Sequence, residues 1–459
     1  MLTFHDPHRF GRREFLRVGA LSLGGLTLGN LGAVRGSSFR PLADKSVVFL
    51  FLHGGPSQME TFDPHMEAPV EVRSATGEIP TALPGVTFAS SFPKLAKLAD
   101  HLAIVRSFVP GDANHDIKPV VGKDTFGANL GSAYAHLAGA NHPETGMPRN
   151  IALFPQAVDP SSQPGTKSFG NFSATGPFSA ATAPFLPGAG GAQQNDMKLA
   201  LSLDRFDDRK GLLKDLDRAK SSLDQSQRDG IDSAREKALN LLLGGVSDAF
   251  DLTKEDARTV ERYDTAPLVR PENIDKKWKN YNNYVDNAKS LGKLLLLARR
   301  LCERGAGFVT VTTNFVWDMH SDVNNAPVEE GMRYMGPPLD HALSAFLDDL
   351  HARGLFDQIL LVCCGEMGRT PKINSKGGRD HWGNLGPLVL AGGGLNMGQV
   401  IGRSARTGGE PNSDPVRIKN LISTVMHTLF DVGQLRIQRG VPREILQMTE
   451  AEPIRGLHS

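Results

Sequence analysis

A chain of 459 residues with 40% hydrophobic and 22% charged side chains has the composition of a soluble globular protein, large enough for one big domain or two. Its formal net charge of +1 produces no field that favours nucleic acid or an acidic membrane surface, so we expect no nucleic-acid partner. The three cysteines, Cys302, Cys363 and Cys364, form neither a disulfide framework nor a pattern with metal-ligand spacing. We expect all three thiols to be buried and unreactive.

The first 38 residues resemble an export signal. Arg12 and Arg13 precede Phe15 and Leu16, and a mildly apolar run rich in Gly, Leu and Ala follows at 18–31. Paired arginines before a weakly hydrophobic segment are typical of signals that the twin-arginine translocase reads, which predicts a periplasmic or extracellular protein. The run is shorter than the roughly 20 residues of a membrane span, so we expect no stable span unless the signal stays uncleaved. The alternative is a disordered tail followed by a core helix.

The rest of the chain alternates between strand and helix patterns. Continuous apolar runs, which are typical of strands covered on both faces, occur at 45–52, 101–108, 150–154, 307–314, 359–364 and 386–394. Apolar residues at helical spacing predict helices at 92–100, 290–301, 339–353 and 418–429.

Helices followed by strands in the C-terminal half predict an α/β fold with a mostly parallel central sheet and helices on both faces. We expect one such domain over residues 39–459, with a helical insertion at about 196–300. The Gly-, Pro- and Ser-rich sequence at 159–193 predicts a long surface loop of this domain.

The run at 359–364 ends in a Gly-, Lys- and Arg-rich loop with polar side chains suited to a site. Glu366 follows the strand directly, where a ligand or a general base would stand, and Arg369 has the geometry to clamp an oxyanion. Asp380 and His381 come later in the same loop; they converge on one ion only if the backbone turns. The alternatives are a solvated crossover loop and a structural Glu366–Arg369 ion pair.

A second pair of ligand-type side chains follows the run at 307–314. Asp318 and His320 are two residues apart, so in an extended chain both side chains point to one side. A carboxylate with an imidazole suits a divalent metal such as zinc or manganese. The alternative is a hydrogen-bonded pair that holds a loop.

The first apolar run ends in a candidate anion-binding loop. His53, Gly54 and Gly55 would let backbone N–H groups approach a tetrahedral anion, and Ser57 is a candidate nucleophile or metal ligand. A plain turn is the alternative. His115, after the run at 101–108, adds a third imidazole. Because several strand ends offer Asp, Glu or His, a metal-centred site accounts for them together.

At these residues the chain resembles the bacterial domain-of-unknown-function 1501 family of exported proteins, over nearly its whole length. The matching motifs are Arg12-Arg13-Glu14-Phe15-Leu16, His53-Gly54-Gly55-Pro56-Ser57-Gln58, Thr61-Phe62-Asp63-Pro64, Arg106-Ser107, Asn114-His115, Phe250-Asp251-Leu252, Leu296-Leu297-Ala298-Arg299-Arg300-Leu301, Trp317-Asp318-Met319-His320, Gly365-Glu366-Met367-Gly368-Arg369-Thr370-Pro371 and Gly378-Arg379-Asp380-His381-Trp382.

That family is similar in fold to the alkaline phosphatase and sulfatase superfamily. The resemblance implies metal ligands at strand ends, with Asp318 and His320 matching a carboxylate–histidine motif, and with His381, accompanied by Asp380, matching a late histidine ligand. His53 stands where the superfamily's first strand usually carries an aspartate ligand. The signature of formylglycine sulfatases appears only at 413–417, far from the expected place, so we do not expect that mechanism.

Together these features predict an exported hydrolase of sulfate or phosphate esters that depends on a divalent metal, with zinc, calcium and manganese as candidates. Its expected metal ligands are Asp318, His320, Asp380, His381 and His115. Its substrate would be a small-molecule or polysaccharide ester. The alternative is a non-catalytic exported metal- or anion-binding protein of the same fold.

Overall fold

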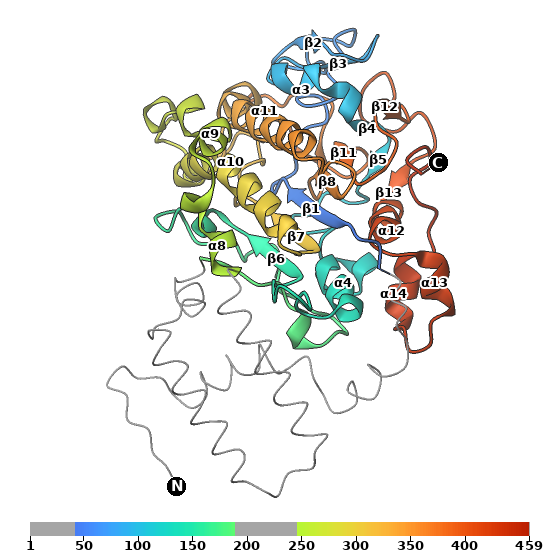
Figure 1. Cartoon of the computed structure of the whole chain (residues 1–459). Coiled ribbons are helices and arrows are strands. Elements are labelled where there is room, and N and C mark those ends of the chain that lie inside the picture. Colours follow the sequence, from blue (N-terminus) through green and yellow to red (C-terminus); the bar gives the residue numbers. More distant parts are fainter. Residues whose placement is uncertain (1–41, 189–245, 459) are drawn as a thin grey trace, which may run out of the picture.

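A seven-stranded sheet is the centre of the computed structural model, which describes residues 42–188 and 246–458 (Figure 1). Its strands, in spatial order, are β12 (Gln399–Ile401), β4 (Ala103–Val105), β11 (Leu388–Gly392), β8 (Ile359–Cys364), β1 (Ser46–Phe51), β7 (Phe308–Val311) and β6 (Asn150–Leu153). Only β11 runs antiparallel to both of its neighbours in this sheet. The mostly parallel α/β sheet expected from the sequence is confirmed.

Helices cover both faces of this sheet (Figure 1). On one side lie α10 (Tyr281–Glu303) and α11 (Val328–Ala352), and on the other α4 (Leu130–Ala138) and α12 (Ile418–Leu429). Successive residues of β1 therefore face opposite layers. Val48 and Leu50 join the apolar cluster under α10 and α11, whereas Val47 and Phe49 join the cluster under α4 and α12. This double burial explains why the strands are continuous apolar runs.

The helix α11 is longer than the sequence predicts. The sequence predicts a start at residue 339; just before it stand Pro337 and Pro338, which remove backbone donors and normally end a helix. The structure begins the helix at Val328 and keeps both prolines inside it. Buried side chains continue on either side of the prolines, with Met335 before them and Leu339 after them. Tertiary packing of this face therefore outweighs the local signal.

The other described elements are shorter. Three two-stranded ribbons pair β2 (Glu78–Pro80) with β3 (Thr87–Ala89), β5 (Phe108–Val109) with β13 (Val416–Arg417), and β9 (Gly368–Arg369) with β10 (His381–Trp382). Short helices are α3 (Pro93–Lys97), α8 (Val246–Phe250), α9 (Ala257–Arg262), α13 (Val432–Ile437) and α14 (Arg443–Met448). The expected export signal and residues 196–245 of the expected insertion lie outside the described residues.

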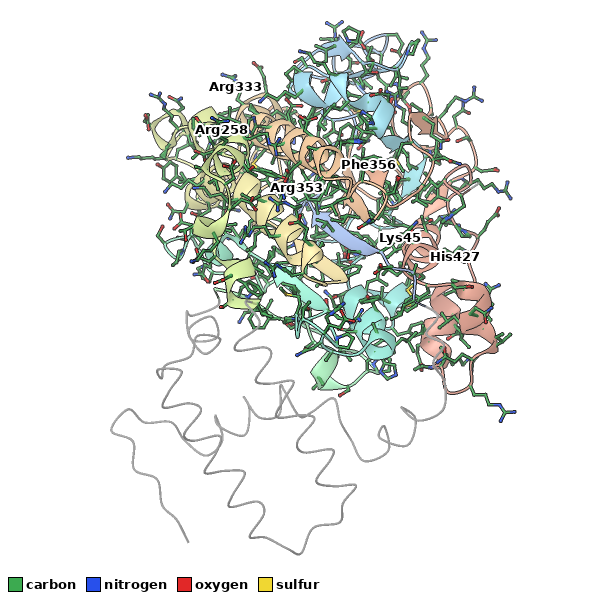
Figure 2. The ribbon with its side chains drawn as sticks, in the orientation of Figure 1. Lys45, Arg258, Arg333, Arg353, Phe356 and His427 are labelled. Carbon is green, nitrogen blue, oxygen red and sulfur yellow. The ribbon has the colours of Figure 1, made fainter. Side chains whose placement is uncertain are left out.

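A buried network of charges joins α10 to α11, and we call it the arginine network. Arg299, 1% exposed, reaches Asp349 at 2.9 Å and Glu255 at 2.7 Å. Arg353, labelled in Figure 2 at the end of α11, also binds Asp349, at 3.0 Å, and Glu255, at 3.2 Å. Because each carboxylate meets more than one guanidinium, the network fixes the two helices against each other.

The three thiols are buried and unpaired, as the sequence predicts. Burial raises the pKa of Cys302 and of Cys363 to about 12. These sulfurs are therefore protonated and inert at neutral pH. Among the described helices, none combines the length and apolar character that a membrane crossing requires.

Candidate metal centre

The loops that follow β8, β1 and β7 meet at one edge of the sheet, because these three parallel strands are neighbours. The backbone N–H groups of Val316 and Trp317 both donate to the carbonyl of His53. At Gly54, with φ of +113°, a Cβ atom would lie 2.7 Å from the backbone nitrogen of Asp318. Only glycine permits this approach. The expected glycine loop thus contacts protein backbone and brings Asp318 to the strand ends.

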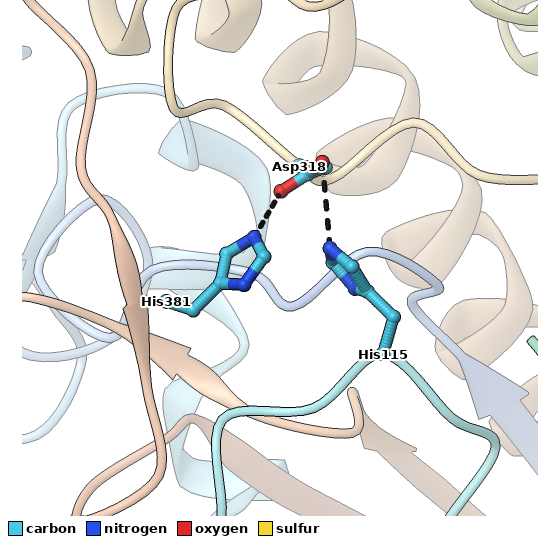
Figure 3. A group of neighbouring side chains, drawn as sticks. All are labelled: His115, Asp318 and His381. Carbon is cyan, nitrogen blue, oxygen red and sulfur yellow. Dashed lines mark hydrogen bonds and ion pairs between the residues drawn. The ribbon is translucent and has the colours of Figure 1, made fainter.

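Asp318 is the hub of the site. It is 3% exposed, and its carboxylate faces three imidazoles. The Nε2 atom of His320 lies 2.9 Å from Oδ2, and that of His115 lies 3.5 Å from the same oxygen. The Nε2 atom of His381 lies 3.1 Å from Oδ1 (Figure 3). Residues from three distant segments therefore converge on one carboxylate.

Three of these side chains have the spacing of metal ligands. One ligand atom each from His115, Asp318 and His381 can be chosen so that all lie within 4.8 Å of one another (Figure 3). Zinc bonds of about 2.0–2.2 Å place tetrahedral ligand atoms about 3.4 Å apart, so small side-chain shifts would suffice. Within residues 42–188 and 246–458 this is the one such group of His, Cys, Asp or Glu. The donor set fits a divalent cation.

Buried partners orient these candidate ligands. His115 Nδ1 lies 3.1 Å from Glu366 Oε1, and Glu366 is fully buried and accepts from the backbone N–H of Gly54 at 2.9 Å. If Nδ1 carries the proton, Nε2 presents its lone pair toward Asp318. Asn325 donates to Asp318 Oδ2 at 3.1 Å. A carboxylate behind a ligating histidine is the usual support of a protein metal site.

The environment favours an ionised Asp318. Burial alone raises the pKa of this carboxyl, but hydrogen bonds from His115, His320 and His381, together with the charge of Arg369, outweigh it and hold the pKa below its usual range. Burial lowers the pKa of His115, yet its bonds to Asp318 and Glu366 raise it overall. The hydrogen bond between His320 and Asp318 likewise raises the pKa of His320. A divalent cation bound between these imidazoles would compensate the charge of the carboxylate.

Arg369 makes its contacts with the protein. Its Nη2 atom lies 2.6 Å from Asp318 Oδ1, and its guanidinium also donates to the carbonyls of Gly54, Gly55 and Arg379. The side chain is 1% exposed. The sequence suggested an anion clamp at this residue, whereas the observed contacts hold Asp318 and the glycine loop together.

The structure does not bring every expected site residue to the cluster. Asp380 is exposed and accepts a hydrogen bond from Asn374, at 3.0 Å. It directly precedes His381 of β10, so the two side chains leave the extended backbone on opposite sides. Ser57 is buried, and its hydroxyl accepts from the backbone N–H of Glu60 at 3.4 Å. In the described parts of the chain it makes no hydrogen bond to the cluster.

His53 lies beside the cluster as a buried, neutral imidazole. It is 2% exposed, and its Nε2 atom has no hydrogen-bond partner in the described structure. Burial lowers its pKa, a shift opposed by the charges of Glu366 and Asp318 and reinforced by that of His115. The N–H of Gly54 is committed to Glu366, which leaves it unavailable to the anion that we expected there.

Two aromatic side chains near the cluster were not anticipated from the sequence. Phe315 lies 4.6 Å from the ring of His115, centroid to centroid, and Phe169 lies 5.1 Å from it. Both come from irregular segments without hydrophobic periodicity, so no local pattern singles them out.

The model of a family described as "Protein of unknown function (DUF1501)" matches residues 44–455. No curated protein matches the chain in sequence. Similar solved structures include the lipoteichoic acid synthase LtaP from Listeria monocytogenes, at 11% identity over 92% of this chain and 82% of that chain, with a TM-score of 0.31. The PsFucS1 sulfatase from Pseudoalteromonas sp. has 13% identity over 91% of this chain and 72% of that one, with a TM-score of 0.36.

The phosphonate monoester hydrolase SpPMH from Silicibacter pomeroyi has 9% identity over 84% of this chain and 73% of that chain, with a TM-score of 0.33. These are similarities of fold at low TM-scores. They say nothing of the chemistry of this chain.

Proposed function

We propose that this protein, which belongs to the DUF1501 family, is an exported hydrolase of sulfate or phosphate esters that depends on a divalent metal. The observation that carries the proposal is the convergence of His115, Asp318 and His381 on one point. His320, 2.9 Å from Asp318, is a fourth candidate ligand. Two or three imidazoles with one carboxylate favour zinc or manganese over calcium, which prefers oxygen ligands throughout.

Each neighbouring residue has a defined task in this proposal. When bound, the metal would polarise the ester and lower the pKa of a water molecule. Glu366 would hold His115 in the tautomer that frees Nε2, and Arg369 would keep Asp318 ionised and in place. The geometry favours water as nucleophile, since the hydroxyl of Ser57 contacts Glu60 and makes no hydrogen bond to the cluster in the described chain.

A second candidate function is a non-catalytic protein that binds a metal at the same site. Two observations favour it. Arg369 is occupied with protein groups, and Ser57 is not connected to the cluster within the described residues. On this alternative the metal would be bound without turnover.

Metal analysis of the purified full chain, followed by assays with aryl sulfates and aryl phosphates, separates these possibilities. We expect one divalent ion per chain in the wild type, and loss of both metal and turnover in His381→Ala. His136→Ala, on α4, is the matched control and should change neither. Stoichiometric metal without turnover of any ester would favour the binding protein. Wild-type protein that takes up no divalent metal would contradict both functions.

Export is the remaining component of the proposal, and it rests on Arg12 and Arg13. Replacing both with lysine keeps the charge but alters the paired guanidinium groups that the translocase reads. We expect the variant to accumulate in the cytoplasm, as measured by cell fractionation. Equal export of variant and wild type would exclude the twin-arginine route.

A further inference from the structure

The loop at 159–188 places an aromatic side chain beside the cluster. Phe172 anchors the loop: it is buried, 5.8 Å from Phe51 and 5.5 Å from Phe154 between ring centroids. Phe169, three residues earlier, is only half-buried and stacks on Phe315 at 4.5 Å with 29° between the ring planes. The surface loop that the sequence predicts at 159–193 thus reaches the strand ends through these two rings.

Phe169 and Phe315, which we call the aromatic pair, lie outside the core. Neither ring belongs to either of the two apolar clusters of the described structure, nor to the half-buried side chains that pack against those clusters. Both remain partly exposed. Leaving two large rings partly in water next to polar side chains forgoes burial that would stabilise the fold. Their position therefore calls for a reason other than core packing.

The aromatic pair touches a candidate metal ligand. Phe315 meets His115 edge to face, at 4.6 Å and 80°, and Phe169 lies 5.1 Å from the same imidazole. The buried His53 is also in contact with both rings, at 5.1 Å and 5.7 Å. Any ester whose oxyanion reached the cluster would have its organic group within reach of this apolar surface.

We propose that the aromatic pair is the binding platform for a ring in the organic group of the substrate ester. The inference rests on the proposed hydrolase function and adds a substrate class: esters of aryl or pyranosyl alcohols over esters of small open-chain alcohols. Both kinds of ring present a flat face with C–H or π character, which stacks on phenylalanine. The exposed parts of Phe169 and Phe315 supply the complementary surface.

The competing explanation is that the rings only hold His115 and His53 in place. A purely structural role would weaken metal binding and would affect every ester equally. A platform would change the discrimination between ring and non-ring ligands and leave the metal content intact. The two explanations therefore predict different ratios of affinity for ring and non-ring ligands, and different metal contents of the variants.

The test uses two phosphonates that cannot be hydrolysed at an ester bond. Dissociation constants of phenylphosphonate and methylphosphonate are measured by calorimetry on the metal-loaded full chain, for the wild type and for Phe169→Leu and Phe315→Leu. We expect the wild type to prefer phenylphosphonate by roughly tenfold, the size of one favourable aromatic contact. Each variant should lose most of this preference, with methylphosphonate binding and metal content unchanged.

The matched control is Phe185→Leu, which alters another half-buried ring, one that packs on Phe250 at 5.5 Å away from the cluster. It should keep the wild-type preference. Phe169 lies on a surface loop, so its variant keeps the test valid if Phe315→Leu does not fold. Competition by phenyl sulfate and by galactose 6-sulfate then distinguishes an aryl ester from a pyranosyl ester. The matching ligand is the one that the Phe169→Leu variant binds more weakly than the wild type does.

The platform would be overturned by equal wild-type affinity for the two phosphonates, or by variants that lose metal in proportion to ligand. Turnover of esters without ring preference would reject the platform and leave the hydrolase function standing. Ring-selective phosphonate binding without turnover of any ester would support the platform and reject the hydrolase.

Discussion

Two buried carboxylates in this protein meet very different partners. Asp349, 1% exposed, is surrounded by guanidinium groups in the arginine network, with Arg299 at 2.9 Å and Arg262 at 2.6 Å. Asp318, 3% exposed, meets one guanidinium and three imidazoles. The first network lies between two helices, and the second lies where three strands end.

The two clusters differ in whether the cationic partners of the carboxylate can lose a proton. A guanidinium does not lose its proton in a protein, so the arginine network is permanently charged and can only hold elements together. An imidazole gives up its proton near neutral pH and then offers a lone pair. The Asp318 cluster can therefore exchange protons for a cation, whereas the arginine network cannot. Burial alone does not mark a site; the type of partner does.

The largest expected effect comes from breaking the arginine network. Arg299→Met leaves Glu255 and Asp349 with less compensation, and removing one partner of a buried pair typically costs about 3–5 kcal/mol. We expect that loss in the free energy of unfolding, measured by urea denaturation. The metal content of the folded fraction should be unchanged. A loss below about 1 kcal/mol would mean that the network is not structural.

A second experiment targets the carboxylate that supports the proposed metal site. Glu366→Gln keeps an acceptor for the N–H of Gly54 but removes the carboxylate behind His115. We expect metal affinity to fall by about ten- to a hundredfold, the usual effect of losing such a partner, with stability within about 1 kcal/mol of the wild type. Competition with a fluorescent chelator measures the affinity. Unchanged affinity would remove Glu366 from the site.

Acid should weaken the arginine network in a defined range. Burial alone raises the pKa of Glu255, but its hydrogen bond from Arg300 and the charge of Arg299 outweigh it and lower the pKa to about 2. A depressed carboxyl pKa contributes stability above the unfolded value of about 4.5, and this contribution is lost as the pH falls toward 2.

Glu255→Gln provides the measurement for this effect. The variant should be less stable than the wild type by about 2 kcal/mol at pH 7, because a charge-assisted hydrogen bond becomes neutral. The gap should narrow steadily below pH 4.5. Urea denaturation of both proteins at pH 7 and pH 3 measures the difference in stability. A difference of equal size at the two pH values would exclude a contribution from the titration of Glu255.

The smallest effect is expected at an exposed ion pair that has the same residue types as the arginine network but is not buried. Arg333 and Glu329 are 3.1 Å apart on the surface of α11, with both side chains more than half exposed. Arg333→Ala should change the free energy of unfolding by less than about 0.5 kcal/mol. A larger loss would show that burial is not what distinguishes the arginine network.

The sequence predicts the layers of the fold and part of the site. Burial on both faces leaves a continuous apolar run, so the strands are visible locally. The ligand-type residues after them include His115, Asp318 and His381, which the structure brings together. The start of α11 was not predictable, because the signal of Pro337 and Pro338 is local whereas the packing that overrides it is not.

Other parts of the site depend on contacts between distant segments. Asp380 is next to His381 in sequence, yet the extended backbone turns it toward Asn374. Asp318 lies 51 residues from Arg369 and Gly55 lies 314 residues away, so no spacing rule distinguishes an arginine that binds an anion from one that holds Asp318 in place. The aromatic pair joins residues 146 positions apart, here Phe169 and Phe315, and leaves no periodic trace.

The close approach of Gly54 to the backbone of Trp317 and Asp318 has a consequence for the evolution of related genes. A methyl group there would meet the backbone of Trp317 and Asp318 within 3 Å and move the hub away from its histidines. A gene that acquired Gly54→Ala would still encode every proposed ligand, but its product would no longer bring them to one point. A comparison of the proposed ligand residues alone would therefore miss the loss of this site.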